Sequence, residues 1–262
     1  MKSTVRYVYC VAQNGTLPAT APDGIDAAQV RVVANPEAGL CAVASELDAS
    51  EYAAERASEM MLRADWLSPR AISHDAVVNW AADHADVVPL PMWVMFTDDD
   101  AVGRMLMERE REFHAVLRAT GGAREFGVRV SADGAAMSAV VARLDRSLAE
   151  LEQESRVASP GQAYLLGRKL AEQRKHAVRD IAGRTAETIH SRLSSLSRAS
   201  SARATSLASE PGVILDGAYL VDGEQYDSFR SVVTELMNEY DSDGVRFAFT
   251  GPWPPYRFAH AT

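Results

Sequence analysis

The sequence predicts an α+β fold of two domains, with a mixed α/β domain over residues 1–120 and a ferredoxin-like domain over residues 121–250. Short runs of β-branched and aromatic residues, typical of strands, alternate with segments whose apolar residues recur at helical spacing. The chain has 262 residues, 47% of them hydrophobic, which is enough for two buried cores. Three prolines close to the end predict an extended tail over residues 251–262.

Three strands are expected near the beginning of the chain. The first, Thr4–Val11, is rich in valine and tyrosine and ends before an Asn-Gly turn. Val30–Ala34 and Leu40–Ser45 follow as two short apolar runs. Because Asn-Pro-Glu-Ala-Gly between these runs has the composition of a tight turn, we expect the two strands to pair antiparallel.

Helices follow in the rest of the first domain. One is expected over residues 50–64, and a second begins at Ser68-Pro69, where serine suits the cap and proline the first turn. Val87–Leu90 reads as a buried strand. A third helix, over residues 98–119, starts with three aspartates, whose negative charge suits the positive end of the helix dipole.

The second domain is expected to combine a sheet with long, coiled-coil-like helices. Residues 135–208 form a mainly helical insertion that is interrupted at Ser159–Gly161, and the Ser/Ala/Arg-rich stretch Ser191–Ser209 is expected to be a flexible connection. Strands and one amphipathic helix complete a β-α-β-α-β order that is compatible with a ferredoxin-like domain. These elements are the strands Glu125–Val130, Gly212–Val221 and Val245–Phe249 and the helix Gln225–Tyr240.

Charge and hydropathy exclude several classes of function. The net charge of −9 and pI near 5.2 argue against a general binder of nucleic acid or of anionic membranes. The apolar run Val87–Phe96 reaches only half of the ~20 residues that a membrane span needs, and no secretory signal is evident. We therefore expect a cytoplasmic protein in which Cys10 and Cys41 are buried, reduced thiols.

No residue is predicted to be catalytic, to bind a cofactor or to ligate a metal. His74 and His84 are ten positions apart, which does not fit a pair of ligands on one helix face, so we expect solvated polar side chains there. Asp98–Asp100 lacks the pattern of a calcium loop. Neither a G-x-S-x-G elbow nor a phosphate-binding loop is present, and the prediction is that the chain is not an enzyme.

One helical segment departs from the acidic average. Arginine and lysine outnumber acidic residues there, most clearly at Arg168, Arg174, Lys175 and Arg179, and further at Lys169, Arg184, Arg192, Arg198 and Arg203. Two interpretations are open: a solvated helix face, or a docking surface for an acidic partner. Binding of RNA would need a platform of stacking aromatic residues, which the segment lacks.

The most specific local pattern is GPWPPY near the end of the chain. Proline has no backbone N–H donor and a fixed φ, so this segment is expected to be a stiff, extended tail that does not prolong the preceding strand. Burial of the aromatic rings of Trp253, Tyr256 and Phe258 favours docking of the tail in a groove, of the same chain or of a partner. The pattern comprises Gly251, Pro252, Trp253, Pro254, Pro255 and Tyr256.

With this pattern the chain resembles the gas vesicle GvpL/GvpF family, in which a strand followed by a GPWPPY-like tail is a specific mark. After Pro89-Leu90 the family reads like Arg-Phe-Gly-Thr, whereas this chain has Pro91–Val94. Further matches extend from one end of the chain to the other: Tyr7–Tyr9, Gly39–Val43, Ala71–His74, Val87–Leu90, Glu125–Val128, Gly161–Leu166 and Ala218–Val221.

The resemblance implies a non-enzymatic accessory protein of gas vesicles, either a minor component or an assembly factor. Its partners would be the small, apolar shell protein and other accessory proteins of the vesicle, and it would help to nucleate the shell. Two alternatives stay open. One is a small-molecule sensor or enzyme built on the ferredoxin-like domain, and the other is a coiled-coil scaffold.

Overall fold

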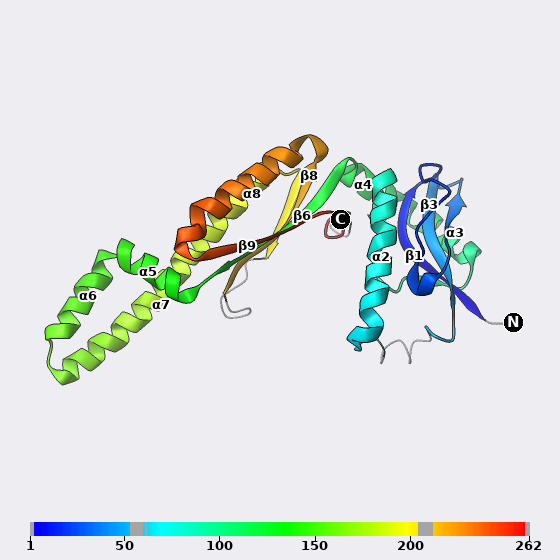
Figure 1. The fold of residues 1–262 in the computed structure, drawn as a ribbon. Helices are drawn as coiled ribbons and strands as arrows, with labels where there is room; N and C mark the ends of the chain where they lie inside the picture. The colour runs from blue at the N-terminus through cyan, green and yellow to red at the C-terminus, as the bar shows by residue number, and fades with distance from the viewer. Residues whose placement is uncertain (1–2, 53–59, 61, 204–211, 260–262) are drawn as a thin grey trace. The chain divides into compact units, whose positions relative to one another are not determined.

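The computed structural model describes residues 3–52, 60, 62–203 and 212–259. The chain divides into two compact units, each shown in Figure 1. Residues 1–125 and 252–262 make up the first unit, and residues 126–251 make up the second. The chain therefore ends in the unit in which it begins.

A five-stranded antiparallel sheet forms the centre of the first unit. Its main path has the order β2-β3-β1-β4, and β5 pairs with β1. The predicted hairpin of β2 and β3 is confirmed, with Val32 opposite Val43. The strands are β1 (Thr4–Gln13), β2 (Val30–Asn35), β3 (Leu40–Asp48), β4 (Val87–Pro89) and β5 (Met95–Phe96).

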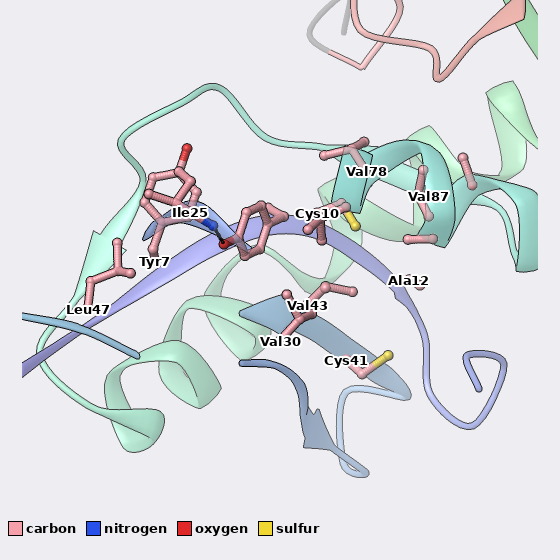
Figure 2. Packing of buried hydrophobic residues seen from close by; sticks show 14 of the residues in the cluster. Tyr7, Cys10, Ala12, Ile25, Val30, Cys41, Val43, Leu47, Val78 and Val87 are labelled. Carbon is pink, nitrogen blue, oxygen red and sulfur yellow. Dashed lines mark hydrogen bonds between the residues drawn. The ribbon is translucent and has the colours of Figure 1, made fainter. Parts of the chain in front are cut away.

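A β-bulge in β1 decides which side chains face each core. The register against β3 shifts between Val8 and Cys10, so Tyr9 is the extra residue. Because a bulge interrupts the alternation of side chains, Tyr9 and the next residue, Cys10, both lie in the same core. Val8 and Val11 lie in the core on the other face. Figure 2 shows the first of these cores, with residues of β1, β2 and β3 beside Val78.

The helices of the first unit differ from the prediction at two points. Helix α2 (Ala64–His84) begins four residues before Ser68, which makes no cap, and Pro69 lies inside the helix. The expected single helix over residues 98–119 is two helices, α3 (Asp99–Glu108) and α4 (Glu110–Thr120). The predicted start of a helix at the three aspartates is confirmed, and Asp98 caps it, since Asp98 Oδ1 accepts a hydrogen bond from Ala101 N at 2.8 Å. Most of the helix predicted over residues 50–64 lies outside the described residues.

A four-stranded sheet in the order β7-β8-β6-β9 forms the second unit, together with four helices. The second half of α7 and helix α8 supply Ile189, Leu193, Phe229 and Val233 to one core with the sheet. The strands are β6 (Ala123–Ala132), β7 (Ala199–Arg203), β8 (Val213–Asp222) and β9 (Val245–Trp253). The helices are α5 (Gly134–Leu144), α6 (Arg146–Val157), α7 (Pro160–Ser194) and α8 (Tyr226–Tyr240).

Two predictions for the second unit were wrong. Part of the expected flexible connection is strand β7, which pairs antiparallel with β8, so Arg203 lies in a strand and Arg198 directly precedes that strand. Strand β9 continues to Trp253 and includes Pro252. Proline is tolerated there because β9 is an edge strand, and an edge strand does not need every backbone N–H for the ladder.

The predicted break between two helices at Ser159–Gly161 is confirmed. Helix α7 begins at Pro160, and Gln162 Oε1 accepts a hydrogen bond from the hydroxyl of Ser159 at 2.8 Å. Helix α6 packs on α7, and its residues Leu148 and Leu151 are buried. Figure 1 shows α6 and the first half of α7 as a hairpin that extends beyond the sheet of this unit.

We expect Phe229→Ala to destabilise the second unit by about 3–5 kcal/mol, because a large ring is removed from a packed core. Its ring lies 5.4 Å from that of Phe126 and 5.6 Å from that of Tyr219, measured between centroids. Amide hydrogen exchange in β8 measures the loss. Met237→Ala, on an exposed position of α8, is the control and should cost less than about 1 kcal/mol. Equal losses for both variants would contradict the assigned core.

Candidate functional site

The C-terminal segment is docked on the first unit of its own chain. Pro254 and Pro255 are buried, and Ala259 lies in the core that contains α3 and α4 side chains. Phe258 N and Ala259 N donate hydrogen bonds to Pro255 O, at 3.2 and 2.9 Å. Residues 256–259 therefore form a turn, which corrects the expectation of an extended tail. The reason is that proline restricts its own φ but does not prevent a turn after it.

Two hydrogen bonds fix this turn. The hydroxyl of Tyr256 donates to Asp75 Oδ1 of α2 at 3.0 Å, and the ring packs against the core of β1 and α2. Burial is the main cause that raises the pKa of Tyr256, and the neighbouring Asp75 raises it further. Arg257 N donates to Glu125 Oε2 at 2.8 Å. Burial raises the pKa of Glu125, and the hydrogen bond from Arg257 opposes that shift.

The GPWPPY pattern has two different parts. Gly251, Pro252 and Trp253 are exposed at the end of β9, whereas the two prolines that follow are buried. Of the aromatic side chains that were expected to dock, Trp253 stays 41% exposed, and Tyr256 is partly buried. The second part thus attaches the segment to its own chain, and the first part presents an indole ring to solvent.

A buried polar network lies next to the residue of α2 that binds Tyr256. His74 is only 2% exposed, which corrects the expectation that it is a solvated side chain. Its Nδ1 lies 2.8 Å from the hydroxyl of Tyr7, which also accepts a hydrogen bond from Trp93 N at 3.3 Å. Trp93 has a φ of +75°, a conformation that few non-glycine residues adopt. Two consecutive residues of α2 therefore have different partners: His74 contacts Tyr7 in the core, and Asp75 binds Tyr256 of the docked segment.

His74 is held neutral by its surroundings. Desolvation is the main cause that lowers its pKa, while Asp75 and a backbone hydrogen bond with Leu90 raise it. A neutral imidazole has one acceptor nitrogen and one donor nitrogen. Since the Tyr7 hydroxyl accepts from Trp93 and has its own proton to donate, Nδ1 of His74 takes the acceptor role.

The predicted basic residues of α7 do not all lie on one surface. Arg168, Lys175 and Arg179 are exposed. Arg174 is only partly exposed, and its guanidinium lies 3.5 Å from Glu152 of α6. Nε of Arg174 is buried and has no hydrogen-bond partner among the described residues. Arg174 therefore belongs to the contact between α6 and α7, whereas the other three side chains are exposed.

A hollow of about 830 Å³ lies between β2 and α3. Asp99 accepts hydrogen bonds there from Arg31 and from Arg6, both at 2.7 Å. The Arg31 guanidinium in particular lowers the pKa of Asp99 to about 2. The carboxylate is thus fully ionised and paired, an arrangement that supports structure more than proton transfer.

The described residues lack several features that functional sites often show. They contain no group of three or more His, Cys, Asp or Glu side chains that could hold a metal ion. Both cysteines are buried and unpaired, as predicted, and desolvation raises the pKa of each. None of the described helices has the length and apolar character that a membrane span requires.

The fold and these sites define a class of protein. It is a mixed α/β protein of two units, each built on one sheet, in which Arg168, Lys175, Arg179 and Trp253 are exposed. The model of the family described as gas vesicle synthesis protein GvpL/GvpF matches residues 5–260. This chain belongs to that family.

Similar proteins agree with the assignment. Gas vesicle protein L of Streptomyces sp. (strain CB03234) is 31% identical, and the alignment covers 97% of this chain and 92% of the relative. Gas vesicle protein L2 of Halobacterium salinarum is 29% identical over 97% of this chain and 91% of its own length. The crystal structure of GvpF from Anabaena sp. PCC7120 has a TM-score of 0.74 over 99% of this chain and all of that chain. At 18% identity it shows the same fold.

We expect Tyr256→Phe to weaken docking of the C-terminal turn, because it deletes the donor to Asp75. A double-mutant cycle with Asp75→Ala should give a coupling energy of about 0.5–1.5 kcal/mol. The free energy of unfolding of the first unit is followed by the fluorescence of its tryptophans in urea. A coupling energy below about 0.3 kcal/mol would show that the hydrogen bond does not stabilise the docked state.

The stability of the first unit should fall as the pH falls through the ordinary histidine pKa of 6.5. In the folded state the pKa of His74 is lowered, so below that pH the unfolded chain binds a proton that the folded chain does not. The slope of free energy against pH should be positive there, with the value for one full proton, about 1.4 kcal/mol per pH unit, as its upper limit. His74→Phe should flatten this slope, whereas His84→Phe, at the exposed end of α2, should not. Unchanged slopes in the first variant would refute the assignment.

Proposed function

We propose that this protein is an accessory protein of gas vesicles, a minor component or assembly factor that acts in the cytoplasm in association with the vesicle. Its partners are the shell protein and other gas vesicle accessory proteins, and its task is to help nucleate the vesicle. The observation that carries the proposal is family membership over residues 5–260. The names of the relatives, gas vesicle proteins L and F, support it.

The C-terminal segment supports a role in binding another protein. Pro254, Pro255 and Tyr256 hold the segment on the first unit, and this attachment fixes the chain next to Trp253. A large aromatic ring on an ordered backbone loses little conformational freedom on binding, and tryptophan is enriched among the residues that dominate interfaces. Trp253 therefore suits the role of an anchor for an apolar partner such as the shell subunit.

Helix α7 supplies the second surface of the proposal. Arg168, Lys175 and Arg179 are spaced by seven and four residues, which places them on one face of the helix. All three are exposed, and none of them makes an ion pair with a described residue. A row of unpaired cations attracts an acidic segment and steers its approach. An accessory protein of the vesicle with such a segment is the partner proposed for this face.

We also propose that the second unit is a ferredoxin-like domain with a helical insertion. The order of its elements, with β7 included, is β-α-β-β-α-β, which is the order of that class. The strand order β7-β8-β6-β9 places the first strand between the third and the fourth, and this supports the same proposal. The inserted helices are α5, α6 and the first half of α7.

The alternatives have weaker support. A small-molecule sensor or enzyme needs polar groups that converge in a pocket, and the hollow between β2 and α3 offers an ion pair of Arg31 and Asp99 at its wall. A pure coiled-coil scaffold leaves the exposed ring of Trp253 without a role. Nucleic acid and membranes are not among the proposed partners, because the chain carries a net charge of −9.

We expect Trp253→Ala to reduce capture of gas vesicle proteins at least tenfold while the protein stays folded, because the ring is exposed in the free chain. The measurement is co-purification with each co-expressed vesicle protein, followed by flotation of cells that carry the variant. Ile72→Ala, which removes an exposed side chain from α2, is the matched control. Normal buoyant vesicles in a strain without the gene would overturn the proposed function itself.

Reversal of two charges, Arg168→Glu with Lys175→Glu, should abolish capture of an acidic partner and leave capture through Trp253 unchanged. The physical reason is that two cations of the row become like charges for the incoming carboxylates. Arg118→Glu on an exposed position of α4 controls for the change in net charge. If the double variant binds every partner as the wild type does, α7 is merely a solvated face.

A further inference from the structure

Strand β2 lies at the edge of the sheet in the first unit, and its outer edge is open in the described part of the chain. It comes first in the order β2-β3-β1-β4, and among the described residues only β3 pairs with it. Proline, lysine or a bulge often protects such an edge, but β2 has neither residue and its register against β3 is regular. Its one charged residue, Arg31, is paired with Asp99. The edge can therefore accept another strand.

The register identifies the backbone groups that face this open edge. Directly before β3, Gly39 O accepts a hydrogen bond from Asn14 N, and directly after β3, Ala49 N donates to the residue that precedes β1. Odd-numbered positions along β3 therefore bond toward β1, and even-numbered positions bond toward β2. The partners of these even-numbered positions on β2 are Arg31, Val33 and Asn35. Because the direction alternates along a strand, Val32 and Ala34 direct their N–H and C=O groups outward.

The hollow of about 830 Å³ between β2 and α3 lies along this edge. Residues 31–35 of β2 all line it, although their side chains alternate between the two faces of the sheet, so the backbone forms part of the wall. Helix α3 forms the other wall and runs in the same direction as β2, since Asp99 pairs with Arg31, and Gly103 O accepts a hydrogen bond from Asn35 Nδ2 at 2.9 Å. The hollow is thus a groove between an open strand edge and a helix, which suits the addition of an extended peptide as a strand.

Three exposed charged residues of α3 line the groove, with signs in the order negative, positive, negative. They are Asp100, Arg104 and Glu108, and none of them forms an ion pair with another described residue. Four residues of a helix rise by about 6 Å, and two residues of a strand span about 6.6 Å. Alternate side chains of a strand in the groove therefore meet the three charges in turn. The complementary order on that strand is basic, acidic, basic.

We infer that this groove binds an extended segment of a partner protein as a strand added to β2, and that the segment has the pattern basic-x-acidic-x-basic. The charged side chains of the segment face α3. The side chains at x point to the other face of the sheet, beside Val32, which is 40% exposed, so apolar residues suit these positions. The backbone groups of Val32 and Ala34 supply the hydrogen bonds of the new ladder.

The sequence of the chain excludes a second copy as the source of this segment. Arginine or lysine residues occur four positions apart at only two places, and the residue midway between them is Thr4 or Ala177, neither of them acidic. The occupant is therefore a different polypeptide, and the net positive charge of its segment suits a chain of net charge −9. The inference is independent of the proposed role in gas vesicles, because it uses only the open edge, the hollow and the charges of α3.

Fluorescence anisotropy of a labelled peptide with the core Lys-Val-Glu-Val-Lys tests the inference on the full-length protein. At low salt, about 0.05 M NaCl, we expect a dissociation constant on the order of 100 µM for so short a segment. Ala34→Pro removes an outward N–H that the ladder with β3 does not use, and it should weaken binding at least tenfold. Saturation with the peptide should slow amide exchange at Val32 and Ala34 at least tenfold, but not at Val33, which is already bonded to β3.

A charge exchange makes the test specific for the groove. Arg104→Glu should weaken binding of this peptide about tenfold, and the variant should bind a Lys-Val-Lys-Val-Lys peptide about tenfold more tightly than the wild type does, because unlike charges face one another again. Arg118→Glu, on an exposed position of α4, makes the same change in net charge and should alter both affinities less than about twofold. Thermal unfolding confirms that each variant is folded.

Two results would overturn the inference. One is a Lys-Val-Glu-Val-Lys peptide that does not bind the wild-type protein at concentrations up to about 1 mM. The other is binding that is indifferent to both Ala34→Pro and Arg104→Glu, because the peptide then lies outside the groove.

Discussion

Docking of the C-terminal turn on the first unit is the interaction on which the arrangement of the chain depends. The chain leaves the first unit along β6 and comes back along β9, and these two strands are neighbours in one sheet. Buried Pro254 and Pro255, with the hydrogen bonds from Tyr256 to Asp75 and from Arg257 to Glu125, hold the end of the second strand. Residues 254–259 are thus held on the unit that contains β1.

The docked turn rests on a core whose polar groups are satisfied. His74 and Asp75 are neighbours on α2, and they bind Tyr7 on one side and Tyr256 on the other. An unpaired polar atom in such a core would be costly, so a network of this kind requires each member to be in place. The bulge at Tyr9 and the positive φ of Trp93 belong to the same region of the first unit. In this region the irregular backbone takes part in specific hydrogen bonds, such as the one from Trp93 N to the Tyr7 hydroxyl.

Local patterns in the sequence predict much of this fold. Runs of apolar residues mark β1, β2 and β3, and the start of α3 follows from the three aspartates at positions 98–100. Strand β7 is different, because Ala199–Arg203 has no β-branched residue and becomes a strand through pairing with β8. Burial of His74 and the contact of Tyr256 with Asp75, 181 positions away, depend on tertiary packing that no spacing reveals. Exposure of Trp253 follows from the edge position of β9, which is equally non-local.

The continuity of α7 has a consequence for how the length of this protein can vary. The helix has 35 residues, and only its second half is anchored in a core by Ile189 and Leu193. Each residue turns a helix by about 100°, so one inserted residue between the anchored half and Leu165 would rotate that side chain away from its face. An insertion of seven residues would nearly preserve the direction and lengthen the helix by about 10 Å. Insertions and deletions in this helix among natural relatives should therefore come in multiples of seven residues.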